Sequence, residues 1–168
     1  LCALILVFKD VLSSLSRKVK KAMRIVVSIL SALALVLIVL WAQWQIEWGQ
    51  LSTTEDANNN TKEILEGYSV LYDKLKGDPY FLYNYAYVLS DYGDCKSADR
   101  MARESFSLMS NYDTALFIAD NAKECGDAEA AEEYYWLASK MCPVRFMPLY
   151  GLFCLYKDMD RIDDMFEI

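Results

Sequence analysis

The chain contains no histidine, and after residue 24 acidic side chains outnumber basic ones by 23 to 11. Without histidine there is no Cys/His metal site and no histidine base, and no CxxC spacing takes their place. We also find no nucleophile–base pattern that would support a soluble enzyme. The acidic remainder excludes nucleic acid as a partner, because phosphate binding needs clusters of Lys and Arg. We therefore predict no metal, no cofactor and no catalytic residue in this segment.

Charge is also missing between Arg24 and Glu47. The 22 residues from 25 to 46 are uncharged, and as a helix they would cover about 33 Å, enough for the hydrocarbon core of a bilayer. Three tryptophans stand at the far end, where aromatic rings settle at the headgroup level: Trp41, Trp44 and Trp48. We predict a transmembrane helix over 25–46. A cleaved signal peptide is the alternative, but no small-residue cleavage site follows.

Residues 1–24 hold six basic side chains and one acidic one. Positive charge beside a membrane helix stays on the cytoplasmic side, so we predict a cytoplasmic loop over 9–24 and place everything from 47 onward outside the cytoplasm. The apolar run 1–8 is expected to end a preceding membrane helix, or alternatively to belong to an amphipathic hairpin. Because the chain starts without Met and stops within an amphipathic pattern, we expect a fragment of a longer protein. Polar residues predict a linker over 47–60.

A repeat of 33 to 34 residues follows from position 61. Gly93, Gly126 and Asp160 are spaced by 33 and 34 residues, the period of a helix-turn-helix repeat. Small residues recur at fixed offsets from the glycines, where two antiparallel helices cross closely: Ala86 and Ala98, then Ala119 and Ala131. We predict a half repeat over 61–76, repeats over 79–111 and 112–145, and an incomplete repeat over 146–168.

The first helix of each repeat carries a stripe of apolar or aromatic residues with i, i+3, i+4, i+7 spacing. The twelve positions are Leu82, Tyr85, Ala86, Leu89, Ala115, Ile118, Ala119, Ala122, Leu149, Leu152, Phe153 and Tyr156. Asp78, Asp94 and Asp127 stand where N-caps are needed. The pattern resembles a tetratricopeptide repeat array, so we predict an all-α fold in which an α-solenoid follows the membrane helix. A generic helical bundle is the alternative.

Two segments go beyond that general consensus: Phe81-Leu82-Tyr83-Asn84-Tyr85-Ala86 and Met141-Cys142-Pro143-Val144-Arg145-Phe146-Met147-Pro148-Leu149-Tyr150. They resemble the C-terminal repeats of O-antigen ligase and polymerase-like proteins of Gram-negative envelopes, over residues 25–168. The resemblance implies an inner-membrane protein that joins lipid-linked glycans, with this segment on the periplasmic side. No catalytic residue carries over, because the family's catalytic loops precede this segment.

Tetratricopeptide arrays bind partners along the face of their first helices. The residues expected on that face are Tyr80, Tyr83, Tyr87, Ser90, Asp113, Leu116, Asp120, Lys123, Met147, Tyr150, Cys154 and Lys157. Tyrosine suits either a peptide or the CH face of a sugar. The alternative is that these tyrosines simply pack against neighbouring helices.

Two functional hypotheses follow. In the first, the segment docks a protein or the glycan substrate for an envelope ligase or polymerase. In the second, it is a membrane-anchored adaptor without chemistry. Among the five cysteines, Cys95 and Cys125 lie at the turn ends of adjacent hairpins and form the best candidate pair for a disulfide. Otherwise they are small buried apolar residues.

Overall fold

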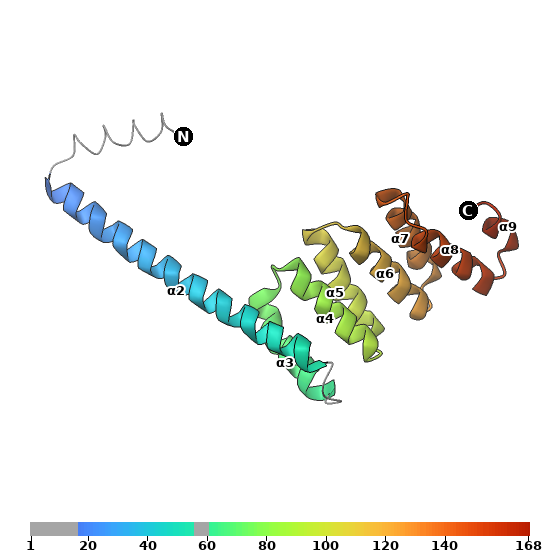
Figure 1. The fold of residues 1–168 in the computed structure, drawn as a ribbon, viewed down its shortest axis with the longest axis horizontal. Coiled ribbons are helices and arrows are strands. Elements are labelled where there is room, and N and C mark those ends of the chain that lie inside the picture. The colour runs from blue at the N-terminus through green and yellow to red at the C-terminus, as the bar shows by residue number, and fades with distance from the viewer. Residues whose placement is uncertain (1–16, 56–60) are drawn as a thin grey trace. The chain divides into compact units, whose positions relative to one another are not determined.

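The computed structural model describes residues 17–55 and 61–168 (Figure 1). The chain divides between Ile46 and Glu47 into two compact units. Every regular element of the described ranges is a helix. The predicted all-α class is therefore confirmed.

The first unit consists of most of α2, which runs Arg17–Glu55. The described part of the chain contains one helix that is long and apolar enough to cross a membrane, Val19–Thr53. Its apolar side chains are exposed, as with Ile29, Leu35 and Leu37 at 62%, 63% and 58%, so α2 is suited to be a membrane anchor. The expected preceding helix at 1–8 lies outside the described residues.

The loop predicted over 9–24 is helical from Arg17 onward. Lys and Arg are good helix formers, and neither Gly nor Pro interrupts the chain before Gly49. Helix α2 also continues through residues 47–55 of the linker predicted over 47–60. The hydroxyls of Ser52 and Thr53 do not compete with the helix but bond back to the Gly49 carbonyl at 3.0 and 3.1 Å.

Tertiary contacts also keep the end of α2 helical. The Trp48 indole donates to Asn84 Oδ1 at 3.2 Å and meets the Phe81 ring edge-on at 5.8 Å. Leu51 packs on Gly67 so closely that a Cβ there would lie 2.7 Å from Leu51 Cδ2. The end of α2 therefore packs on α3 (Thr61–Leu75), which lies within the predicted half repeat over 61–76.

The remaining helices form antiparallel pairs stacked one after another (Figure 1). Helix α4 (Pro79–Asp91) pairs with α5 (Cys95–Leu108), and α6 (Tyr112–Glu124) pairs with α7 (Ala128–Met141). Helix α8 (Met147–Asp158) is followed by the single turn α9 (Ile162–Met165). Each pair also packs on the next, α5 on α6 and α7 on α8, which is the organisation of an α-solenoid.

Three equivalent turns explain the repeat period. Gly93 and Gly126 have φ of +81° and +79°, and Asp160 takes the same left-handed conformation at +55°. In each turn, the amide of the following residue donates to the carbonyl five residues earlier, which is the hydrogen bond of a Schellman C-cap. These bonds join Asp94 to Leu89 at 2.9 Å, Asp127 to Ala122 at 2.8 Å and Arg161 to Tyr156 at 2.9 Å. The helix starts are capped as predicted, because the carboxylates of Asp78, Asp94 and Asp127 accept backbone N–H bonds.

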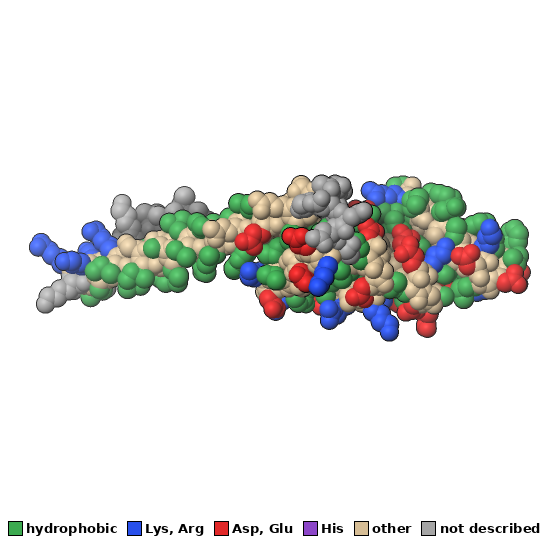
Figure 2. All heavy atoms as spheres, turned by 90° about the horizontal axis from the view of Figure 1, so that it is seen from below, with side chains coloured by type: hydrophobic (Ala, Val, Ile, Leu, Met, Phe, Trp, Pro, Cys, Tyr) green, Lys and Arg blue, Asp and Glu red, His purple; other side chains and the backbone are tan. Residues whose placement is uncertain are grey.

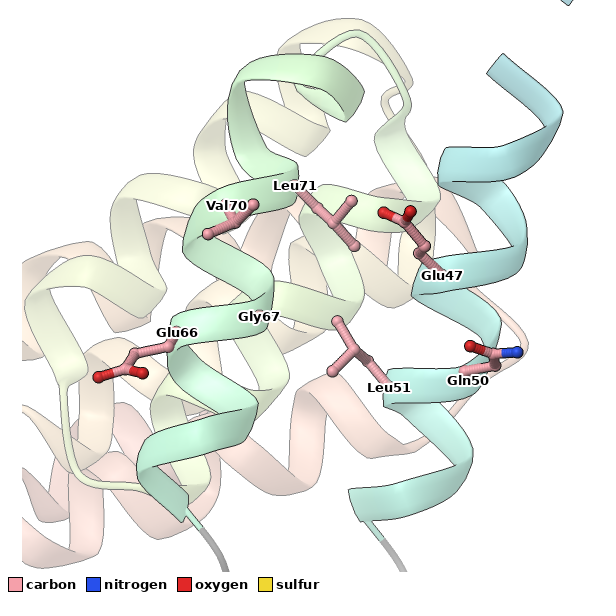
Figure 3. Close-up of a pocket in the computed structure, with 7 residues that line it drawn as sticks. All are labelled: Glu47, Gln50, Leu51, Glu66, Gly67, Val70 and Leu71. Atoms are coloured by element: carbon pink, nitrogen blue, oxygen red, sulfur yellow. The ribbon is translucent and has the colours of Figure 1, made fainter. Parts of the chain in front are cut away.

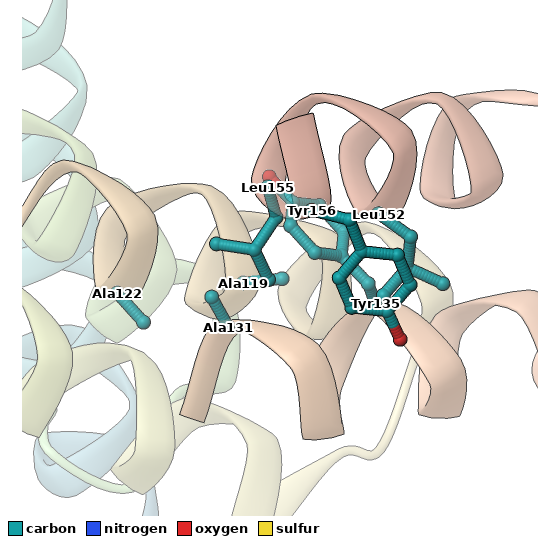
Figure 4. Close-up of a cluster of buried hydrophobic side chains, with 7 residues drawn as sticks. All are labelled: Ala119, Ala122, Ala131, Tyr135, Leu152, Leu155 and Tyr156. Carbon is teal, nitrogen blue, oxygen red and sulfur yellow. The ribbon is translucent and has the colours of Figure 1, made fainter. Parts of the chain in front are cut away.

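Nine of the twelve predicted stripe residues are buried, including Ala86 and Ala119, which are both 0% exposed. Figure 4 shows the cluster formed where α6, α7 and α8 meet: Ala119, Ala122, Ala131, Tyr135, Leu152, Leu155 and Tyr156. Tyr85 and Leu149 are half-buried. Phe153 is 41% exposed and was wrongly predicted to be core. It stands where Ala86 and Ala119 meet the second helix of their hairpins, but α9 is a single turn and does not cover it.

Candidate partner-binding face

The predicted binding residues come from the first helices of three hairpins, α4, α6 and α8. Tyr80, Tyr87 and Tyr150 are 63%, 49% and 50% exposed. Asp113, Asp120 and Lys157 are exposed, whereas Tyr83, Leu116 and Lys123 are half-buried. Leu116 packs against the buried cluster of Figure 4, so it contributes to the core as well as to this face.

A hollow of about 340 Å³ lies between the start of α4 and the start of α6. Its lining residues are Pro79, Tyr80, Tyr83, Met109, Asn111, Asp113 and Thr114. Three of these were predicted from the repeat register: Tyr80, Tyr83 and Asp113. The hollow combines aromatic rings, a thioether and a carboxylate. This mixture can hold an extended segment with an apolar or cationic side chain.

The tyrosines of α4 differ in how closely they pack against neighbouring rings. Tyr83 meets the Phe117 ring edge-on at 5.6 Å, and Tyr87 lies 6.2 Å from the same ring. Burial raises the pKa of Tyr83, and the carboxylate of Asp113 adds to the rise. Tyr83 therefore stays a neutral hydroxyl in the wall of the hollow. Tyr80 is the most exposed of the three and is free to meet a ligand.

Two charged contacts mark the ends of this face. The Arg145 guanidinium donates to Asp113 Oδ1 at 3.1 Å and lies 4.3 Å above the Tyr112 ring. Lys123 Nζ pairs with Asp158 Oδ2 at 3.3 Å. The Arg145–Asp113 pair is largely exposed, so it is weak. A cation on a partner can therefore displace Arg145 from Asp113 at small cost.

Asp120 makes a contact within the array that the repeat register did not predict. Its carboxylate accepts the hydroxyl of the buried Tyr135 at 2.6 Å. Partial desolvation of the carboxylate raises the pKa of Asp120, while the hydrogen bond from Tyr135 opposes that rise. The contact ties α6 to α7, so we assign Asp120 mainly to the stability of the array.

A second hollow, of about 480 Å³, lies between the end of α2 and α3 (Figure 3). It is lined by Glu47, Gln50, Leu51, Glu66, Gly67, Val70 and Leu71. In Figure 3 Leu51 points from α2 toward Gly67 of α3. The sequence could not indicate this hollow, because residues 47–60 were predicted to be a linker.

The sequence also missed Phe117 and Arg145 as members of the binding face. Phe117 lies one position beyond the predicted Leu116, and Arg145 comes from the segment before α8. A large aromatic residue beside an expected surface position was the signal for Phe117. No local pattern indicates Arg145, because its contact with Asp113 joins residues 32 positions apart.

The two ends of the chain differ in the sign of their net charge. In Figure 2 basic side chains gather at the start of α2, and acidic side chains are spread over the repeat helices. Residues 61–168 contain 20 acidic and 11 basic side chains. Within 17–55 and 61–168, no three His, Cys, Asp or Glu side chains are grouped as metal ligands.

Comparisons with solved structures agree with this architecture. The chain is similar to a structure titled "Crystal structure of MamA protein", with a TM-score of 0.65, 14% identity and coverage of 76% of this chain and 68% of that one. It is equally similar to "MamA RS-1 ArsTM double mutant", at 0.65 and 14%, over 74% and 70% of the two chains. MamA is a helical repeat protein of the tetratricopeptide type. No family model and no curated protein matches the sequence. The fold is therefore a tetratricopeptide-like α-solenoid.

Proposed function

We propose that this chain is a membrane-anchored adaptor that holds a segment of a protein partner on the face formed by α4, α6 and α8. The observation that carries the proposal is the hollow lined by Tyr80, Tyr83 and Asp113. It lies on the helices that a tetratricopeptide-type array presents to its ligands. The long apolar helix α2 supports the membrane anchor.

The chemistry of the hollow favours a partner segment that carries Lys or Arg. Tyr80 offers an exposed ring for a cation–π contact, and Asp113 offers a carboxylate beside it. The excess of acidic side chains in 61–168 would attract such a segment and speed its association.

The membrane and its sidedness belong to this proposal. Basic residues at the start of α2 support a cytoplasmic N-terminal side and an extracytoplasmic array, as in the inner membrane of a Gram-negative cell. A reporter enzyme that is active only outside the cytoplasm, fused after Ile168, tests this arrangement. Activity of a cytoplasmic reporter at the same position would reverse it.

The glycan ligase or polymerase interpretation stays a second hypothesis. It rests on the resemblance of residues 81–86 and 141–150 to that family, and neither solved structure adds support for it. In that case the tyrosines would stack on sugar rings. Binding of an O-antigen polysaccharide to the full chain, lost in Tyr80→Ala, would favour this hypothesis over the adaptor.

The adaptor proposal is tested by site-specific photocrosslinking in membranes of the source cell. A photoreactive residue at Tyr80 should capture a defined partner, and one at the exposed Lys96 of α5 should not. The captured protein is then purified and its affinity measured. Tyr80→Ala and Asp113→Asn should each weaken binding roughly 10- to 100-fold, as expected for contacts worth about 1–3 kcal/mol, and Lys96→Ala should leave it unchanged. Equal crosslinking at both positions, or unchanged affinity in both groove variants, contradicts the proposal.

A further inference from the structure

Two cysteines lie at the junction between the α4–α5 and α6–α7 hairpins. Cys95 is the first residue of α5, and Cys125 directly follows α6. The described cysteines, Cys95, Cys125, Cys142 and Cys154, are free thiols in this structure. The question is therefore whether the first two can be joined without moving the backbone.

Asn121 holds both cysteines in place. The side-chain amide of Asn121 donates to the backbone carbonyl of Cys95 at 3.1 Å. The backbone carbonyl of Asn121 accepts the Cys125 N–H at 2.9 Å. Its side-chain oxygen also accepts the Ser90 hydroxyl of α4 at 3.1 Å. Asn121 is only 2% exposed, so these bonds are shielded from water and difficult to break. One buried side chain thus links α4, α5 and the end of α6.

The turns next to Cys95 and Cys125 fix the backbone that carries the two thiols. Asp94, directly before Cys95, caps α5 by accepting the Ser97 N–H at 3.1 Å. Gly126, directly after Cys125, closes the Schellman turn with φ of +79°. Partial burial raises the pKa of the Cys125 thiol to about 12, and the neighbouring Cys95 adds to the rise. The Cys95 carbonyl lies against the Asn121 side chain, and Cys125 follows Asn121 by one helical turn, so the two cysteines are neighbours at the junction.

We propose that Cys95 and Cys125 form a reversible disulfide that joins α5 to α6, with a small disulfide such as oxidised glutathione as the oxidant. One cysteine loses its proton to water and attacks the glutathione disulfide, forming a mixed disulfide and releasing one glutathione thiolate. The other cysteine loses its proton and attacks the protein sulfur of that mixed disulfide, releasing the second glutathione. Two protein thiols are oxidised to one S–S bond, and one glutathione disulfide is reduced to two thiols.

The bond would connect successive hairpins whose first helices, α4 and α6, both line the hollow with Tyr80 and Asp113. It would restrain the angle between these helices and close a loop of about 30 residues in the unfolded chain. We expect oxidation to raise Tm by on the order of 10 °C. The exposed position of Cys125 gives the oxidant access.

The test uses the full chain in detergent micelles, equilibrated at graded ratios of oxidised to reduced glutathione. Free thiols are alkylated, the protein is digested, and peptides are identified by mass spectrometry. The expected product is a Cys95–Cys125 crosslinked peptide whose fraction follows the glutathione ratio and disappears with dithiothreitol. Cys95→Ser and Cys125→Ser should each abolish both this peptide and the rise in Tm. Cys154→Ser, the matched control, should retain both.

Three outcomes overturn the proposal. In the first, all thiols are alkylated at the highest ratio while circular dichroism shows a folded chain. In the second, oxidation stops at glutathione adducts on Cys95 or Cys125. In the third, the crosslink joins Cys142 or Cys154 to another cysteine. Because the two serine substitutions are nearly isosteric and leave the Asn121 backbone bonds intact, an unchanged dichroism spectrum separates loss of the disulfide from loss of the fold.

Discussion

Gly151 of α8 offers a sharp test of the packing between hairpins, because two physical effects oppose each other there. Replacing a helical glycine with alanine normally stabilises a helix by roughly 0.5–1 kcal/mol. At Gly151, however, a Cβ would lie 2.3 Å from Cε1 and 2.5 Å from Cζ of Tyr135. The Tyr135 ring is 2% exposed, so it has no open space into which to move.

Gly151→Ala must therefore displace the ring or separate α7 from α8. Overpacking of this kind costs about 1–3 kcal/mol. A displaced ring also disturbs the hydrogen bond from its hydroxyl to Asp120, which measures 2.6 Å; a hydrogen bond to a charged group contributes about 1.5–3 kcal/mol. After subtraction of the helix-propensity gain, we expect a net loss of about 2 kcal/mol.

The assay is urea unfolding of the full chain in detergent, followed by the far-ultraviolet circular dichroism of the helices. Gly49→Ala serves as the matched control, because a Cβ at that helical position meets nothing within 4 Å, and we expect a gain there. A double-mutant cycle isolates the contact: in a Tyr135→Ala background Gly151→Ala should become neutral or stabilising, a coupling of about 2–3 kcal/mol. If Gly151→Ala stabilises the chain that retains Tyr135, the reasoning is refuted.

Three further predictions use the same unfolding assay. Trp48→Phe keeps an aromatic ring but removes the indole donor to α4, and should cost about 1 kcal/mol; no change would mean that residues 47–55 do not dock. Hydrogen bonding from Arg161 lowers the pKa of Glu132 in the folded chain. The stability that this carboxylate contributes is therefore present above its unfolded pKa of ~4.3 and is lost as pH falls through the lower folded pKa. Glu132→Gln should reduce the fall in free energy of unfolding between pH 7 and 3, and an unchanged pH dependence would contradict the prediction. Phe153→Ala should cost less than about 1 kcal/mol, because its ring is 41% exposed, whereas Leu152→Ala at 0% exposure should cost about 2–5 kcal/mol; equal losses would mean that Phe153 is covered.

Local signals predicted much of the repeat architecture. The positive φ of Gly93 and Gly126 and the capping carboxylates of Asp94 and Asp127 agree with their places in the sequence. These features depend on backbone geometry over a few residues, so composition and spacing reveal them. The third turn kept the pattern with Asp160 in place of glycine, because Asp tolerates the left-handed conformation better than most residues.

The candidate binding face was predicted less completely. Register alone assigned Tyr80, Tyr83 and Asp113 to one face, and the structure shows that all three line one hollow. It could not show that Asp120 would be engaged by Tyr135 or that Arg145 would reach Asp113. Those contacts depend on how hairpins twist against each other, which the period of a single helix does not contain.

The sequence by itself determined the helical period, the caps and turns, and the presence of one long apolar helix, because each follows from local propensity and hydrophobicity. Only the tertiary structure decided that residues 47–55 stay helical, since Trp48 and Leu51 find partners on α3 and α4. It also decided that Phe153 is exposed while Ala86 and Ala119 are buried at equivalent places. The physical reason is that a side chain is buried only where another element packs against it, and that element comes from a distant part of the chain.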